Sequence, residues 1–392
     1  MVAEKISRLT QLACRGRHKT YDPSFIQTFS DCDVCGPSPL FAEYDLTPRP
    51  PESVINLKEQ SMWRYAELLP VQNHDDIVSL GEGWTPILNL KRTANTLGLN
   101  QLLLKDESLN PTGSFKARGL SAAISKAKEL GISKCIIPTA GNAGVALSAY
   151  CARAGMKATV VMPTITPAIF VKECELYGSE VILVDGLIDA CAKKVAQLNA
   201  DKSYFDLSTM KEPYRLEGKK TMGYEVAEQL NWKLPDVILY PTGGGTGLIG
   251  IWKAFHEMIQ LGWINTKLPK LIAVQSDQCQ PVVRAFHKIE NGSSNHISSS
   301  SLAYGLNVPK AFALQQIMDV LKQSGGDAIA VSDQEIQGST KEIIRKEGLL
   351  ICPEGGALHA ALKKLLIDET ISRNEKVLML NTGSGVRYLK NF

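Results

Sequence analysis

From about residue 100 to the end of the chain, short apolar runs alternate with amphipathic segments, and few folds accommodate this rhythm. Nearly continuous apolar runs are typical of strands buried on both faces, and the segments between them are long enough for crossover helices. The sequence therefore predicts an α/β fold with open, parallel-rich sheets flanked by helices. The runs that carry this prediction are LLLKDE at 102, CIIPTA at 135, ATVVMP at 158, EVILVD at 180, DVILYP at 236, KLIAVQ at 270, AIAVSD at 328 and KVLMLN at 376.

The composition is that of a folded globular protein that acts on a small molecule. Of the 392 residues, 44% are hydrophobic, and 43 Lys and Arg stand against 40 Asp and Glu, which leaves a net charge of +3. No block of like charge marks a nucleic-acid or membrane surface, so we expect neither partner. The first twenty residues lack the apolar run of a signal peptide, and we expect a cytoplasmic location.

The segment KDESLNPTGSFKARGL, residues 105–120, predicts a reactive lysine at a strand-to-helix turn. Its Pro, Thr, Gly and Ser residues form a turn that delivers Lys116 into the first turn of a helix. There the positive end of the helix dipole and nearby cations such as Arg118 would lower the pKa of the amine and make it fit to attack an aldehyde. The alternative is a solvated lysine that follows an Asn or Ser cap.

The segment PTGGGTGLIG, residues 241–250, follows the strand DVILY and precedes an amphipathic helix. Backbone N–H groups of consecutive glycines at a helix N-terminus can converge on a phosphate, and the Thr246 hydroxyl can donate as well. No Gly-Lys-Ser/Thr follows, so this is not a nucleotide P-loop, and no ribose-binding acid is placed for a dinucleotide. The alternative is a purely structural turn.

Two further turns lie where a predicted strand ends. PTAGNAGVALSAY, residues 138–150, has small residues that would let a flat ring approach the backbone, and Asn142 can donate a hydrogen bond to a ring oxygen. LNTGSGVRY, residues 380–388, places Thr382 and Ser384 where a hydroxyl can meet a ring nitrogen. A helix cap is the alternative for Asn142, and a simple turn is the alternative for the last segment.

Together these segments, in this order, resemble the fold-type II pyridoxal-phosphate enzymes, with the active site between two sheets. The chain most resembles the threonine synthases, through GEGWTPIL, NPTGSFK, EPYRLEGKKTMGYEV and YPTGGGTGLIGIWKAF, and through NTGSG followed by a basic residue. It resembles the serine and threonine ammonia-lyases more distantly, through TGSFKARG and AGN. The resemblance implies that Lys116 forms the Schiff base with pyridoxal 5′-phosphate. It implies further cofactor contacts at Asn142 for the ring hydroxyl, at Gly243, Gly244, Gly245, Thr246 and Gly247 for the phosphate, and at Thr382 for the ring nitrogen.

The threonine synthase resemblance also implies a substrate and an organisation. The expected reaction is γ-elimination of phosphate from O-phosphohomoserine followed by addition of water at the β-carbon, with Arg215 and Ser114 contacting the substrate. We expect a homodimer, with a large domain at 46–119 and 221–392 and a small domain at 120–220.

The chain also departs from the family. Threonine synthases usually have Asp after the Schiff-base lysine, whereas Ala117 stands here. The substrate-binding Asn and Ser that often precede the Arg-Leu-Glu-Gly motif have no clear match in STMKEPYR. An ammonia-lyase or a β-replacement enzyme on the same fold is therefore an open alternative, and a non-catalytic cofactor-binding protein is a minor one.

Residues 1–45 resemble a zinc ribbon that precedes some threonine synthases, in which two Cys-x-x-Cys pairs bind one metal. The second pair is intact at Cys32 and Cys35, but Arg17 stands where the partner of Cys14 is expected. His18 is the remaining candidate, and its Cys-x3-His spacing differs from the usual one. We therefore predict a degenerate ribbon that binds no metal. Elsewhere, we expect a flexible loop at the Asn/Ser-rich tract 291–301 and a helix-surface position for His359.

Overall fold

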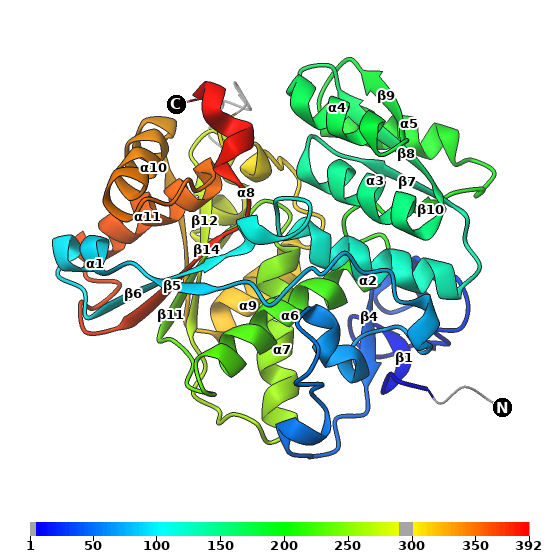
Figure 1. Ribbon diagram of the computed structural model, residues 1–392, viewed down its shortest axis with the longest axis horizontal. Coiled ribbons are helices and arrows are strands. Elements are labelled where there is room, and N and C mark those ends of the chain that lie inside the picture. The colour runs from blue at the N-terminus through cyan, green and yellow to red at the C-terminus, as the bar shows by residue number, and fades with distance from the viewer. Residues whose placement is uncertain (1–4, 290–300, 392) are drawn as a thin grey trace.

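The computed structural model describes residues 5–289 and 301–391, whose strands form three sheets (Figure 1). The tract predicted to be a flexible loop lies outside these residues except for Ser301. Within the described ranges, no helix is long and apolar enough to cross a membrane. Short 3-10 helices occur at η1 (Pro51–Ser53), η2 (Met62–Leu68), η3 (His74–Asp76), η4 (Glu107–Leu109), η5 (Tyr304–Leu306) and η6 (Gly385–Asn391).

A six-stranded sheet forms the larger half of the molecule, in the order β13-β12-β11-β14-β6-β5. Its neighbouring strands pair in parallel, except that β5 is antiparallel to β6. The strands are β5 (Ile87–Asn89), β6 (Gln101–Asp106), β11 (Val237–Pro241), β12 (Lys270–Ser276), β13 (Asp327–Val331) and β14 (Lys376–Asn381).

Helices cover both faces of this sheet because its strands are apolar on both sides. They are α1 (Lys91–Leu97), α6 (Tyr214–Gln229), α7 (Thr246–Gln260), α8 (Pro281–Phe286), α9 (Leu314–Gln323), α10 (Asp333–Glu347) and α11 (Pro353–Ile367). Side chains alternate between the faces, as the two-residue period of a strand requires. Val237 and Leu239 pack in the core beneath α10 and α11, whereas Ile238 and Tyr240 pack in the core beneath α6 and α7 (Figure 1).

A smaller sheet, β10-β7-β8-β9, is parallel throughout and lies at the upper right of Figure 1. One of its faces packs in a core shared with α2 and α3, and Ile136 and Val161 on the other face pack with Cys191 of α5. Its elements are β7 (Lys134–Pro138), β8 (Lys157–Pro163), β9 (Glu180–Val184), β10 (Phe205–Asp206), α2 (Lys116–Glu129), α3 (Asn142–Ala154), α4 (Ala168–Leu176) and α5 (Ile188–Leu198). The two parallel-rich sheets confirm the predicted fold class.

The N-terminal segment forms an antiparallel sheet of its own, in the order β2-β1-β4-β3. Leu12 and Leu40 on this sheet join the core that contains Leu120 of α2, so the segment is docked on the body of the protein. Its strands are β1 (Leu9–Cys14), β2 (Thr20–Tyr21), β3 (Phe29–Cys32) and β4 (Gly36–Tyr44).

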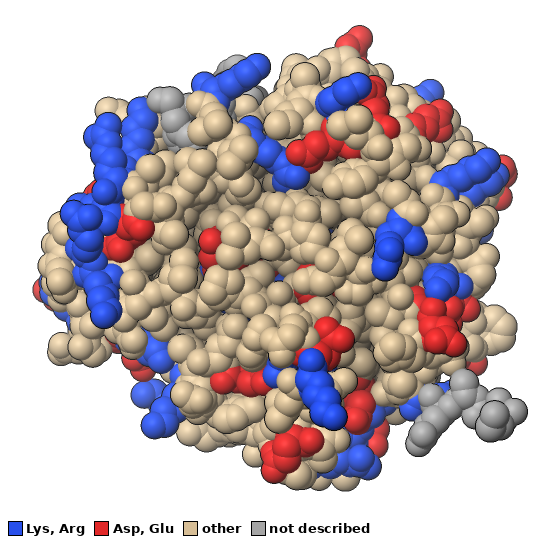
Figure 2. Space-filling model, in the orientation of Figure 1, with Lys and Arg blue, Asp and Glu red and all other residues tan. Residues whose placement is uncertain are grey.

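Helices α2 and α6 connect the two halves of the molecule. They pack against each other, and the backbones approach so closely that a Cβ on Gly218 would collide with the Arg118 carbonyl. The domain boundaries predicted at 119/120 and 220/221 fall within these helices, and the division itself stays a prediction. On the face shown in Figure 2, charged side chains lie mostly around the rim and the centre is mainly uncharged.

A buried network of four charges fixes the first turn of α2. Arg118 donates to Glu107 of η4 and to Glu225 of α6, at Nε–Oε2 and Nη1–Oε1 distances of 2.6 and 2.5 Å. Lys105 of β6 donates to Glu225 from Nζ at 2.6 Å, and all four side chains are fully buried. Burial alone would raise the pKa of Glu225, but the Arg118 and Lys105 cations lower it to about 2. The network is neutral in total, which is what allows four charges to stay buried.

His359 is buried, whereas we predicted a position on the helix surface. It is fully buried on α11 beside α10, where its Nδ1 lies 3.9 Å from Glu342 Oε2, and burial lowers the pKa of its imidazole to about 4. The prediction of a helix-surface position was wrong because both faces of α11 are covered.

We predict that Arg118→Leu lowers the free energy of unfolding by about 3–5 kcal/mol, because it leaves two carboxylates buried without their cation. Lys172→Ala, at a side chain that is 69% exposed, is the control and should change the free energy of unfolding by less than about 0.5 kcal/mol. Urea titrations measure both variants. Because folding lowers the pKa of Glu225, its contribution is complete above about pH 4.5 and is lost as the pH falls toward about 2. A loss below about 1 kcal/mol in Arg118→Leu would contradict this account.

Candidate active site

Four loops meet at a cavity of about 620 Å³ between the two parallel-rich sheets. Each loop leaves the carboxyl end of a strand: the loop before α2 follows β6, and the others follow β7, β11 and β14. Ligands of open α/β sheets bind at such strand ends, because loop side chains and helix N-termini converge there. The sequence segments that were singled out for chemistry are therefore brought together.

Lys116 begins α2 and lines this cavity. The preceding turn is closed by the Gly113 amide, which donates to the Asn110 carbonyl at 2.7 Å, and the Lys116 amine lies 4.5 Å from the Phe115 ring centroid. Burial first, and then the Arg215 cation, lowers the pKa of Lys116 to about 8, although Glu354 opposes the shift. About a tenth of the amine is therefore uncharged at pH 7, far more than for a lysine of ordinary pKa, and only the uncharged amine is a nucleophile.

The glycine loop after β11 ends at the N-terminus of α7. At Gly243, Gly245 and Gly247, an added Cβ would collide with the Gly305 carbonyl, Ile317 and the Tyr240 hydroxyl respectively. At Gly244, an added Cβ would meet only Thr209 Cγ2, at 3.3 Å. The fold itself thus requires three of the glycines, whereas Gly244 lines the cavity with Thr209 as its close neighbour.

Thr246, the first residue of α7, contacts a cation that sequence reasoning had left without a definite role. The Lys219 ammonium donates to Thr246 Oγ1 at 2.6 Å. Burial, followed by the neighbouring Arg215 and Lys116 cations, lowers the pKa of Lys219 well below its usual value. An amine that takes up its proton when an anion binds, placed at a helix N-terminus, is suited to hold a phosphate dianion.

Asn142 lines the cavity from the first turn of α3, and Arg387 of η6 orients its amide. Arg387 Nη1 donates to Asn142 Oδ1 at 2.8 Å, which leaves the Asn142 NH₂ group available as a donor. Glu173 of α4 holds the same guanidinium through Nε and Nη2, at 3.1 and 2.6 Å. The sequence signal for Arg387 was only a basic residue after the terminal NTGSG.

Thr382 also lines the cavity, but Ser114 does not. Ser114 is fully buried, and its hydroxyl has no hydrogen-bond partner within the described residues. Ala117 points into the core shared with α3, so the residue that replaces the family's Asp does not line the cavity. Glu354 lies on the cavity wall, where its Oε1 accepts from the Gly305 amide at 2.8 Å.

Arg215 forms the other side of the cavity, in the first turn of α6. It donates from Nη1 to the Leu207 carbonyl, and its Nε has no partner within the described residues. Ser208 and Thr209 line the cavity beside it, and sequence reasoning had assigned neither a role. Four basic side chains line the cavity against two acidic ones: Lys116, Lys211, Arg215 and Lys310 against Asp189 and Glu354.

The chain matches known proteins over most of its length. The family model described as pyridoxal-phosphate dependent enzyme matches residues 78–383. The threonine synthase of Methanocaldococcus jannaschii is 35% identical over 371 residues, which are 94% of this chain and 91% of that protein. The chain belongs to the threonine synthase family of pyridoxal-phosphate-dependent enzymes. The threonine synthase of Methanosarcina acetivorans, 34% identical over 82% of this chain and 79% of its own length, supports the same assignment.

Solved structures of this enzyme class share the fold. Serine racemase of Dictyostelium discoideum superposes with a TM-score of 0.64 and 24% identity, over 76% of this chain and 92% of that one. Threonine deaminase isoform 2 of Solanum lycopersicum has a TM-score of 0.62 and 21% identity, over 79% and 85%. The cavity suits the cofactor of this family, because it combines an amine of lowered pKa with Gly244 on its wall beside a helix N-terminus.

We predict that Gly244→Val weakens retention of pyridoxal phosphate without a matching loss of fold stability. Its side chain enters the cavity at the helix N-terminus and displaces charged hydrogen bonds worth about 1.5–3 kcal/mol each, so the dissociation constant should rise at least roughly tenfold. Equilibrium dialysis of the cofactor measures this. Gly338→Ala, where an added Cβ meets nothing within 4 Å, is the matched control. Unchanged retention in Gly244→Val would favour the purely structural turn.

Proposed function

We propose that this enzyme converts O-phosphohomoserine and water to threonine and inorganic phosphate. The observation that carries the proposal is a second cationic region in the cavity. Arg215, Ser208 and Thr209 all line the cavity and are separate in sequence from the glycine loop, and Thr209 adjoins that loop at Gly244. A buried phosphate dianion needs partners of this kind, and the relatives named threonine synthase support the same reaction.

The chain's residues would divide the work on the cofactor. Lys116 Nζ would hold it covalently at its aldehyde carbon, while Gly243, Gly244, Gly245, Thr246 and Gly247 would bind its phosphate with help from Lys219. Asn142 would donate to its ring oxygen, and Thr382 would meet its ring nitrogen with one neutral hydrogen bond. When bound, pyridoxal phosphate supplies an electron sink for bonds broken at the substrate's α-carbon.

Lys116 would also move the proton of the reaction. Because its pKa is lowered to about 8, the free amine can accept the substrate's α-proton at Nζ near neutral pH. A lysine at its usual value of 10.5 would be almost wholly protonated there and would be unable to act as a base.

Arg215 would bind the substrate phosphate and neutralise it as it leaves. Its guanidinium is held in place by the Leu207 carbonyl, and Thr209 on the cavity wall can donate a further hydrogen bond to a phosphate oxygen, whereas the Ser208 hydroxyl donates to Asp206. Ser114 was expected in this group; its hydroxyl is buried and does not line the cavity, and its contact with a substrate stays a prediction.

A location in the cytoplasm and assembly as a homodimer belong to the same proposal. Both rest on the similarity of the chain to proteins named threonine synthase. Fractionation of cells and light scattering of the purified protein test them.

Product analysis distinguishes the proposed reaction from the ammonia-lyase and β-replacement alternatives. O-Phosphohomoserine, threonine and serine are offered in parallel to the purified enzyme. Release of inorganic phosphate with threonine supports the proposal, whereas 2-oxobutyrate with ammonia from threonine would overturn it.

We predict that Arg215→Ala raises the KM for O-phosphohomoserine roughly ten- to several-hundred-fold, because each charged hydrogen bond contributes about 1.5–3 kcal/mol. Arg215→Lys keeps the charge without the bidentate geometry, so its KM should lie between those of the wild type and Arg215→Ala. Arg153→Ala, at an exposed arginine on α3, is the control. The measurement is steady-state kinetics at constant cofactor occupancy. An unchanged KM in Arg215→Ala would contradict the role of Arg215.

A further inference from the structure

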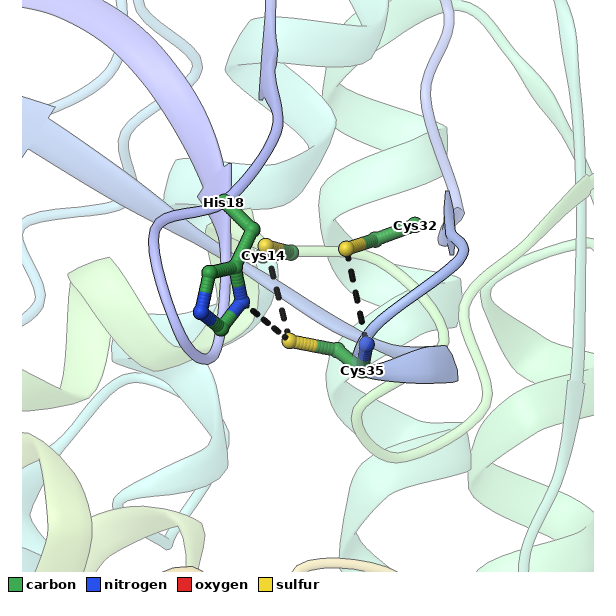
Figure 3. A group of neighbouring side chains, drawn as sticks. All are labelled: Cys14, His18, Cys32 and Cys35. Atoms are coloured by element: carbon green, nitrogen blue, oxygen red, sulfur yellow. Dashed lines mark hydrogen bonds between the residues drawn. The ribbon is translucent and has the colours of Figure 1, made fainter.

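The N-terminal sheet brings three cysteines and a histidine together. Cys14 ends β1, His18 lies in the following turn, Cys32 ends β3 and Cys35 lies in the turn before β4. Their sulfur and nitrogen atoms all lie within 4.8 Å of one another, and the four side chains point toward a common centre (Figure 3). We propose that they bind one structural Zn²⁺, and that the sheet held together by this ion supports the wall of the active-site cavity.

The distances match a tetrahedral metal site. Two Zn–S bonds of about 2.3 Å at the tetrahedral angle place their sulfurs about 3.8 Å apart, and a Zn–N bond of about 2.0–2.1 Å puts nitrogen about 3.6 Å from sulfur. Cys35 Sγ lies 3.7 Å from Cys14 Sγ and 3.3 Å from His18 Nδ1. The sulfurs are too far apart for the 2.05 Å bond of a disulfide, and all three cysteines are free thiols.

Backbone amides are aimed at all three sulfurs. The Gly16 amide donates to Cys35 Sγ at 3.3 Å, the Lys19 amide to Cys14 Sγ at 3.3 Å, and the Cys35 amide to Cys32 Sγ at 3.4 Å. Such contacts stabilise thiolates and fix the direction of metal ligands. Cys14 and Cys32 are buried as well, which protects two of the ligands from solvent.

The turn between β1 and β2 explains why the unusual Cys-x3-His spacing still delivers a ligand. Arg17 adopts a left-handed conformation, with a φ of 57°, and its amide donates to the Cys14 carbonyl at 2.9 Å. The chain therefore reverses its direction between Cys14 and His18, although the spacing is one residue longer than usual. This places the His18 ring beside the cysteine sulfurs. Gly16 makes this possible, because an added Cβ there would collide with the His18 ring. The prediction of no metal assumed that this spacing excluded His18 as a ligand. In the structure, His18 nevertheless lies beside the three cysteines.

A closed set of four protein ligands from thiolate and imidazole is typical of a structural zinc ion. The strands β2 and β3 contain only two and four residues, so this small sheet has little core of its own. A metal that joins the β1–β2 turn to the β3–β4 turn would hold the sheet together at the end where its apolar contacts are fewest.

The strand that carries Cys32 also contacts the wall of the cavity. The Phe29 ring, on β3 with Cys32, lies 5.4 Å from the Phe312 ring, and Phe312 lines the cavity. Arg15, next to Cys14, forms an ion pair with Asp319 of α9 at a distance of 2.9 Å. Residues 304–312 supply much of that wall, so loss of the metal should loosen a segment that contacts the substrate.

The test begins with zinc analysis of the full-length enzyme after growth with added zinc, and it does not depend on the reaction. We expect about one zinc per chain in the wild type and well under one in Cys32→Ser/Cys35→Ser and in His18→Ala. His18→Cys restores a four-ligand set and should restore the metal. His74→Ala removes an exposed histidine elsewhere and should leave it unchanged. A wild type without zinc, or with a Cys14–Cys35 disulfide after purification under reducing conditions, would overturn the site.

Hydrogen exchange followed by mass spectrometry tests the support of the cavity wall. Peptides that cover residues 304–312 should exchange at least about tenfold faster in Cys32→Ser/Cys35→Ser than in the wild type, while peptides of α5 stay unchanged. Equal exchange at 304–312 in a variant that has lost its zinc would overturn this part of the proposal, whatever substrate the enzyme uses.

Discussion

The buried ion pairs of Arg118 fix the geometry on which the active site depends. Arg118 joins η4 and α6 through one guanidinium group, and Lys116 is only two residues away on the same helical turn. Desolvation of these charges is costly, so the network holds only when all of its members are in place. The direction in which Lys116 enters the cavity is therefore set by contacts that no ligand touches.

The cavity concentrates positive charge at the place where phosphates are expected. Burial lowers the pKa of Lys116, Lys219 and Arg215, and the Arg215 cation further lowers the pKa of both lysines. A phosphate bound beside them would relieve this repulsion, so binding of each anion should be coupled to protonation of the neighbouring amines. The same crowding that produces a reactive amine at Lys116 thus gives the cavity its affinity for dianions.

The sequence was most informative where chemistry lies at a strand end. Lys116, Asn142, Thr382 and the glycine loop all line one cavity, because parallel strands bring their carboxyl ends to one edge, and their roles toward the cofactor stay predictions. The positions of Ser114 and Arg387 could not be predicted in this way. Whether a serine in a turn faces a cavity or the core is decided by backbone angles. Arg387 is held in place by Glu173, which is 214 residues distant in sequence.

Two further differences arise from packing and turn conformation. His359 is buried because both faces of α11 are covered, which its local sequence does not reveal. His18 reaches the cysteines because Arg17 tolerates a left-handed conformation, so a rule based on ligand spacing alone missed it.

The most direct test of the account is reductive trapping of the cofactor. The apoenzyme is mixed with pyridoxal phosphate at a series of pH values, reduced with borohydride, digested and mapped by mass spectrometry. The account predicts that the modification lies on Lys116 and that the initial rate of attachment rises with pH and levels off above about 8, because only the uncharged amine attacks the aldehyde. Modification of another lysine, such as Lys219, or a rate that falls as the pH rises to 8, would contradict it.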